Sequence, residues 1–188
     1  IEIVNHSNAF LDLSKVQIRV IQLTTKATST LYKLSHLFPK EPKTNTILAP
    51  MQAAVIFGGG KITPEHEPYV NKGIAHPAFG CALVFFWGVD EEVDKEEVLE
   101  LTPKSAVALE VVASLGKITR LDYVGYTEKA ACLGSYDLHS IRREPSSKFN
   151  RPGPFKRHIE SFFKNLPPNS PGTRINGECF NPIYCTKK

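Results

Sequence analysis

The sequence lacks the features by which several classes of protein are recognised. It contains no run of about 18 apolar residues, so we expect no transmembrane helix. Its four cysteines include no CxxC pair, which argues against a structural zinc site. The motifs GxSxG and HExxH, which mark common hydrolases and zinc proteases, are also absent. We therefore expect neither a metal nor another cofactor.

Cysteine is scarce, and its positions bear on the compartment. Cys81 opens an apolar run, where a thiol is an inert core residue, whereas Cys179 and Cys185 would form a disulfide in a secreted protein. No signal peptide is visible, although the chain begins at Ile1 rather than Met, which leaves open a preceding segment. We expect an intracellular location, such as a host cytoplasm or a virion, with secretion as the alternative.

The longest apolar stretch is residues 81–89, which holds the only tryptophan of the chain, Trp87. A short run rich in aromatic and β-branched residues is typical of a strand buried on both faces. Alternation of Val16, Ile18 and Val20 with polar residues predicts a half-buried strand over residues 16–23. Two further strands are expected at about 51–57 and at 118–126.

Two other segments have the spacing of helices. Residues 28–38 place four apolar side chains on one helical face, and Pro39 marks the end of that segment. Residues 102–115 have a capping Thr102 and a Gly116 suited to a helix terminus, although their β-branched content leaves a strand open. We predict an α+β fold: a mainly antiparallel β-sheet core with two or three helices and a basic C-terminal extension.

Charge is distributed unevenly along the chain. Residues 1–139 carry 13 Lys+Arg and 16 Asp+Glu, whereas residues 140–188 carry 10 Lys+Arg and 3 Asp+Glu. The net charge therefore changes from −3 to +7 near residue 140. This asymmetry predicts a β-rich core domain over 1–141 and a basic, proline-containing extension over 142–188 that meets an anionic partner.

The basic extension supplies the candidate binding residues for nucleic acid or another anion. They are Arg142, Arg143, Lys148, Arg151, Lys156, Arg157 and Lys164. Cations at this density suit phosphate contacts, and they suit an anionic membrane surface equally. An amphipathic helix is predicted at about 155–166, with an apolar face formed by Phe155, Ile159, Phe162, Phe163 and Leu166. That face either packs on the protein's own core or inserts into a membrane.

A second candidate site is the loop over residues 65–76, where Glu65 and Glu67 flank His66 and where His76 follows. Histidine beside carboxylates can act as a general base. A third metal ligand at a recognisable spacing is absent, and a solvated acidic loop is the plainer interpretation. This loop carries the alternative function, a small hydrolase.

Together these features favour a non-enzymatic structural or assembly protein that binds nucleic acid, RNA in preference, or an anionic membrane surface. Self-association is expected. Viral capsid, nucleocapsid and matrix proteins often have this composition, and the comparison rests on composition alone. The sequence provides no candidate catalytic residue outside the 65–76 loop.

Overall fold

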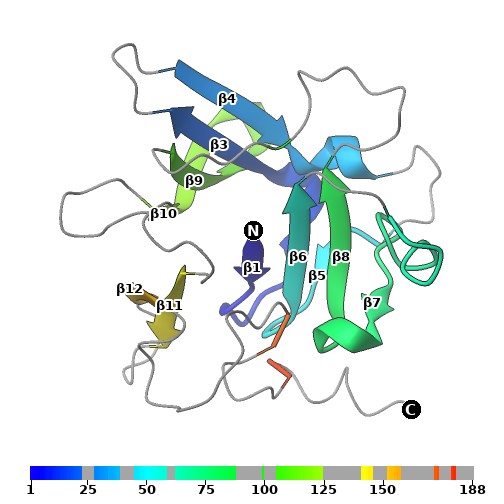
Figure 1. Ribbon diagram of the computed structural model, residues 1–188. Helices are drawn as coiled ribbons and strands as arrows, with labels where there is room; N and C mark the ends of the chain where they lie inside the picture. The colour runs from blue at the N-terminus through cyan, green and yellow to red at the C-terminus, as the bar shows by residue number, and fades with distance from the viewer. Residues whose placement is uncertain are drawn as a thin grey trace.

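Two four-stranded β-sheets enclose the core of this protein (Figure 1). The computed structural model describes residues 1–22, 28–38, 45–58, 62–87, 99, 105–124, 141–145, 152–157, 172–173 and 179–180. For residues 114, 123–124, 141–145 and 152–157 the description covers the backbone alone.

The first sheet has the strand order β1-β6-β8-β7. Its members are β1 (Glu2–Val4), β6 (Ala53–Gly58), β8 (Ala82–Trp87) and β7 (Ala75–His76). Strands β6 and β8 run parallel, and the other pairs in this sheet are antiparallel. The predicted buried strand is confirmed in β8, since five of its six residues are buried.

The second sheet is antiparallel throughout and has the order β10-β9-β3-β4. Its members are β10 (Ile118–Val124), β9 (Ser105–Val112), β3 (Val16–Gln22) and β4 (Thr28–Lys33). Two short antiparallel pairs complete the description. They are β2 (Leu11–Asp12) with β5 (Ile47–Leu48), and β11 (Ile141–Pro145) with β12 (Pro152–Arg157).

The prediction of a β-rich, mainly antiparallel fold is confirmed, but the two or three helices are wrong for the described residues. Those residues contain only short 3-10 turns, namely η1 (Leu13–Lys15), η2 (Leu34–Leu37), η3 (Pro77–Phe79) and η5 (Ser114–Gly116). Segment 28–38 begins as strand β4 because its first residues complete the sheet beside β3, and only its end turns. Segment 102–115 contains β9, so the alternation of Val107, Leu109 and Val111 decides its structure.

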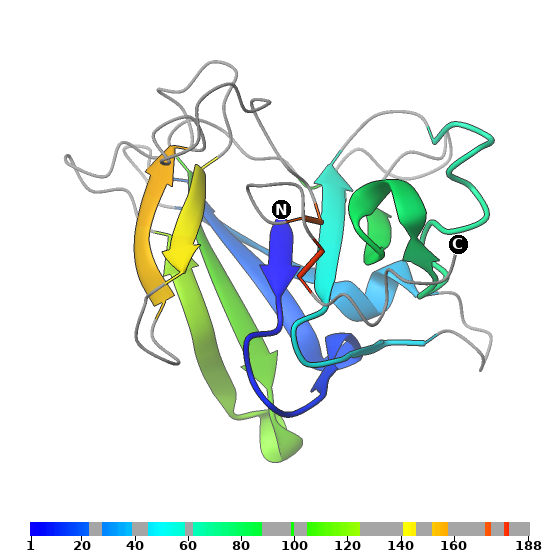
Figure 2. The same cartoon turned by 90° about the horizontal axis from the view of Figure 1, so that it is seen from below.

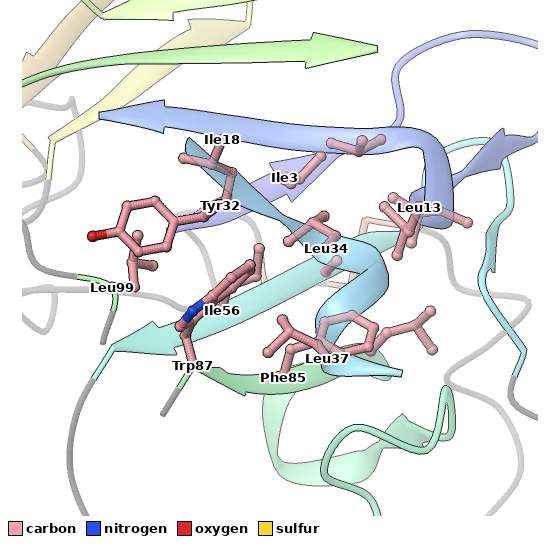
Figure 3. Close-up of a cluster of buried hydrophobic side chains, with 14 of the residues drawn as sticks. Ile3, Leu13, Ile18, Tyr32, Leu34, Leu37, Ile56, Phe85, Trp87 and Leu99 are labelled. Atoms are coloured by element: carbon pink, nitrogen blue, oxygen red, sulfur yellow. The ribbon is translucent and has the colours of Figure 1, made fainter. Parts of the chain in front are cut away.

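The main core lies between the two sheets (Figure 3). Ile18 of β3, Ile56 of β6 and Phe85 of β8 are each at most 1% exposed there. Turn η2 supplies Leu34 and Leu37, which close the space between the sheets. A smaller cluster packs on the opposite face of β6 and β8, where Phe180 joins residues of the first sheet.

Candidate nucleic-acid interface and the histidine loop

The β11–β12 hairpin gathers four of the predicted anion-binding residues. Arg142 pairs in register with Lys156, Arg143 with Phe155, and Ile141 with Arg157. Residues in direct register across an antiparallel pair are neighbours, and like charges in that position repel. The register therefore brings Arg142, Arg143, Lys156 and Arg157 into one two-stranded pair.

The hairpin also differs from the segment that the sequence predicted. Phe155, Lys156 and Arg157 belong to strand β12, so the amphipathic helix does not begin at Phe155. The remainder of that predicted helix, together with Lys148, Arg151 and Lys164, lies outside the described residues. Pro145 and Pro152 pair with each other at one end of the hairpin, which suits a short two-stranded ribbon because proline cannot donate to a ladder.

One acidic residue, Glu144, interrupts the positive charge of the hairpin strands. The register of the pair shifts between Arg143 and Pro145, the interval that contains Glu144. In two views a right angle apart, the hairpin lies on the side of the molecule that carries β9 and β10, opposite β7 (Figure 1, Figure 2).

The histidine loop brings together the two histidines that the sequence singled out. His66 Nδ1 lies 2.8 Å from His76 Nε2, and the ring centroids are 4.9 Å apart. His76 belongs to strand β7 and is only 4% exposed. Its Nδ1 accepts a hydrogen bond of 3.1 Å from the backbone N–H of Ala78, at the start of turn η3.

These contacts assign the tautomers of both rings. A neutral His76 that accepts at Nδ1 carries its proton on Nε2, and so donates to Nδ1 of His66. His66 must then carry its own proton on Nε2, which lies 3.4 Å from Glu65 Oε1. Both acceptor nitrogens of the pair are therefore occupied by donors of the fold, and neither ring retains a lone pair for proton abstraction.

The same arrangement does not provide a metal centre. In the described ranges, no group of three or more His, Cys, Asp or Glu side chains is placed to hold a metal ion. A metal on Nε2 of His76 would also force the proton onto Nδ1 and break the bond from Ala78. The loop reads as a structural hydrogen-bond chain.

Sequence reasoning missed a buried charged cluster on the second sheet. Glu110 of β9 is 3% exposed and accepts from Gln17 Nε2 at 2.8 Å and from Arg19 Nη2 at 3.1 Å. Burial alone would raise the pKa of Glu110, but the bonds from Arg19 and Gln17 and the charges of Arg19 and Arg120 outweigh it and lower that pKa. The available signal was Glu110 itself, a lone carboxylate within an otherwise apolar segment.

Two cysteines are described, and they differ in state. Cys81 directly precedes β8 and is half-buried, so it is not the core residue that the sequence predicted. It is a free thiol whose pKa is raised by burial, the direction expected of an unreactive thiol. Cys179 is disulfide-bonded, and its partner is not among the described residues.

In the part of the chain that the structure describes, no helix has the length and apolarity needed to cross a bilayer. Comparison of the chain with protein-family models, with curated proteins and with solved structures finds no match.

Proposed function

We propose that this protein is a non-enzymatic assembly protein that binds single-stranded RNA through the β11–β12 hairpin. The observation that carries the proposal is the register that places Arg142 opposite Lys156, next to the pair Arg143 and Phe155. Cations bind the phosphate backbone with release of counterions, and an aromatic residue offers a platform on which bases stack. A short ribbon of this composition combines both requirements.

RNA is favoured over a membrane surface by the position of Phe155. Membrane insertion required Phe155 to open the apolar face of a helix, but Phe155 lies in strand β12. Binding of RNA requires no such helix, because strands present cations and aromatic residues to single strands equally well.

The hydrolase alternative is not supported by a free catalytic group. Histidine acts as a general base through a nitrogen lone pair that can receive the substrate's proton. His66 Nδ1 and His76 Nδ1 both accept hydrogen bonds from the protein itself, and Glu65 Oε1 faces His66. We therefore retain the non-enzymatic function, with self-association as part of the same proposal. The disulfide at Cys179 favours the secreted alternative over an intracellular location.

The test measures the binding of a single-stranded RNA oligonucleotide as a function of salt. A quadruple variant neutralises the cations of the hairpin by substitution with glutamine at Arg142, Arg143, Lys156 and Arg157. If all four contact phosphates, the log–log salt slope should become less steep by about 2.8, at about 0.7 for each contact. When salt is raised from 50 to 200 mM, the RNA affinity of both proteins should fall. The factor by which it falls should be about 50 times smaller for the variant than for the parent.

A matched control neutralises four exposed lysines elsewhere, namely Lys15, Lys33, Lys72 and Lys117. This control should retain the parent's salt slope, because its net charge change is the same but the hairpin is intact. A hairpin variant with the parent's affinity and slope would refute the proposal. Binding of both variants to anionic vesicles, with no RNA binding by the parent, would identify a membrane partner instead.

A further inference from the structure

The segment over residues 62–81 covers the outer edge of strand β8. Strand β7 pairs Ala75 with Leu83 and His76 with Ala82. Further along, the backbone N–H of Asn71 donates to the carbonyl of Val84 at 3.0 Å. The Asn71 side chain then accepts from Phe86 N–H at 2.9 Å and donates to the Phe86 carbonyl at 3.3 Å. One segment thus satisfies the edge of β8 along most of its length.

The His66–His76 pair ties the two ends of this covering segment together. His66 lies near its start, where its N–H donates to Thr63, and His76 lies in the strand that pairs with β8. Aromatic rings pack around the pair. Tyr69 is 4.4 Å and Phe79 is 4.8 Å from His76 between centroids.

A proton added to this pair has no free acceptor nitrogen to occupy. Protonation of His66 at Nδ1 would set two N–H groups against each other across a distance of 2.8 Å. Transfer of the His76 proton to Nδ1 would relieve that conflict, but it would break the bond from Ala78 that caps η3. Each route to a protonated pair therefore removes one hydrogen bond that holds the segment in place.

The groups that face the pair determine how strongly it resists a proton. Burial lowers the pKa of His76, and the neighbouring His66 lowers it further, while the charge of Glu65 acts in the opposite direction. Tyr69 faces His76 with its ring, and the backbone of Cys81 donates to the carbonyl of His76 at 3.0 Å. Among the described residues, Glu65 is the carboxylate within ion-pair distance of His66, with its Oε1 3.4 Å from His66 Nε2.

We propose that the His66–His76 pair is a proton-sensitive latch, and that acidification releases residues 62–81 so that β8 pairs with β8 of a second copy of this chain. The released edge would belong to Ala82–Trp87, which is apolar, rich in aromatic residues and free of charge and proline. An exposed edge of that kind is a template for another strand. The second copy offers the same uncharged strand, so no like-charge repulsion opposes the pairing.

The release step stands on the loop geometry alone, whereas the pairing step rests on the assembly part of the proposed function. RNA binding would be measured at pH 7.5, where the latch is closed. A failure of RNA binding would therefore leave the pH-dependent opening measurable, and a failure of opening would leave RNA binding measurable.

The experiment follows amide hydrogen exchange of the intact chain from pH 7.5 to 5, corrected for intrinsic exchange, with the solution mass measured in parallel. The exchange rates give the equilibrium constant between the closed and the open form of residues 71–86. Below the usual histidine pKa of about 6.5, this constant should rise by up to about tenfold per pH unit for each proton taken up on opening. The mass should increase toward a dimer or larger species over the same range. Unchanged protection of residues 71–86 down to pH 5 would overturn the latch, and opening with a constant mass would overturn the pairing.

Three variants separate a latch from a merely structural contact. His66→Gln keeps an acceptor for the His76 proton but cannot titrate, so the pH dependence of opening should fall. Glu65→Gln removes the carboxylate that stabilises a proton on the closed pair, so the closed pair should bind a proton more weakly and opening should move to higher pH. His36→Gln alters an exposed histidine in η2 and should change neither measurement. A Glu65→Gln midpoint at or below that of the parent would contradict the latch.

Discussion

The side chain of Asn71 bonds to both backbone polar groups of Phe86, accepting from its N–H at 2.9 Å and donating to its carbonyl at 3.3 Å. A side-chain amide carries a donor and an acceptor, as a peptide group does. Asn71 therefore substitutes for a neighbouring strand at a position that β7 does not reach. Its backbone φ of 54° suits asparagine, which tolerates the left-handed region better than most residues.

We expect Asn71→Ala to lower the free energy of unfolding by about 1–3 kcal/mol, since it leaves two backbone groups of Phe86 unpaired. Asn71→Gly is the matched variant, because glycine accepts the positive φ but provides no side chain. Both variants should be destabilised in urea unfolding, and the alanine variant more so. A glycine variant as stable as the parent would show that Asn71 serves only its backbone conformation.

Trp87 should be the most costly side chain to remove from the core. It is 5% exposed and packs edge-on against Tyr32 of the opposite sheet, with ring centroids 5.2 Å apart (Figure 3). Trp87→Ala should lower the free energy of unfolding by about 3–5 kcal/mol, because the cavity cannot close completely. Phe10→Ala is the control, since Phe10 is 70% exposed and its removal should change stability by less than about 0.5 kcal/mol.

Apolar runs and alternation predicted the strands well because burial depends on hydrophobicity more than on sequence distance. Residues 81–89 contain β8, residues 16–23 contain β3, and residues 118–126 contain β10. The helix prediction for 28–38 failed because the spacing of its leucines is not unique to a helix. A strand that leads into a 3-10 turn produces the same spacing. There, Tyr32 and Leu34 reach the core while Leu31 is 39% exposed.

The sites were less accessible to sequence reasoning than the strands. Both histidines of the 65–76 loop were selected, yet their direct contact depends on the path of the loop over β8, which no local pattern encodes. The cluster of Gln17, Arg19 and Glu110 joins strands about 90 residues apart in sequence, so it required the sheet order. The basic residues were predicted from their density alone, and the strand register was needed to show which of them are paired along the backbone.

The buried carboxylate of Glu110 should make the fold sensitive to acid. Its pKa is lower in the folded protein than in the unfolded chain, so its stabilisation is complete above about pH 4.5 and declines as the pH falls through the folded value. Glu110→Gln should cost about 3 kcal/mol at pH 7, because Arg19 loses its counter-charge in a partly buried position.

Urea unfolding at pH 7 and at pH 3 measures the difference in free energy of unfolding between the parent and Glu110→Gln. That difference should be smaller at pH 3. Glu67→Gln, which alters an exposed carboxylate, should match the parent at both pH values. If the difference in free energy of unfolding between the parent and Glu110→Gln were the same at both pH values, the shape of the side chain rather than its charge would account for the lost stability.

The pairing of Arg142 with Lys156 predicts opposite effects on stability and on binding. In the free protein, Arg142→Gln or Lys156→Gln removes a cross-strand repulsion, so each should leave stability unchanged or raise it by about 0.2–1 kcal/mol, more at low salt. In the RNA complex, each loses one phosphate contact and should make the log–log salt slope less steep by about 0.7.

A double-variant cycle tests both effects together. The second substitution should give no further gain in stability, because the repulsion is already gone, whereas the two changes in salt slope should add. Lys117→Gln, an exposed lysine in the loop between β9 and β10, should alter neither quantity. Strictly additive stability changes with an unaltered salt slope would show that Arg142 and Lys156 neither repel each other nor contact RNA. That result would remove the observation on which the RNA-binding proposal depends.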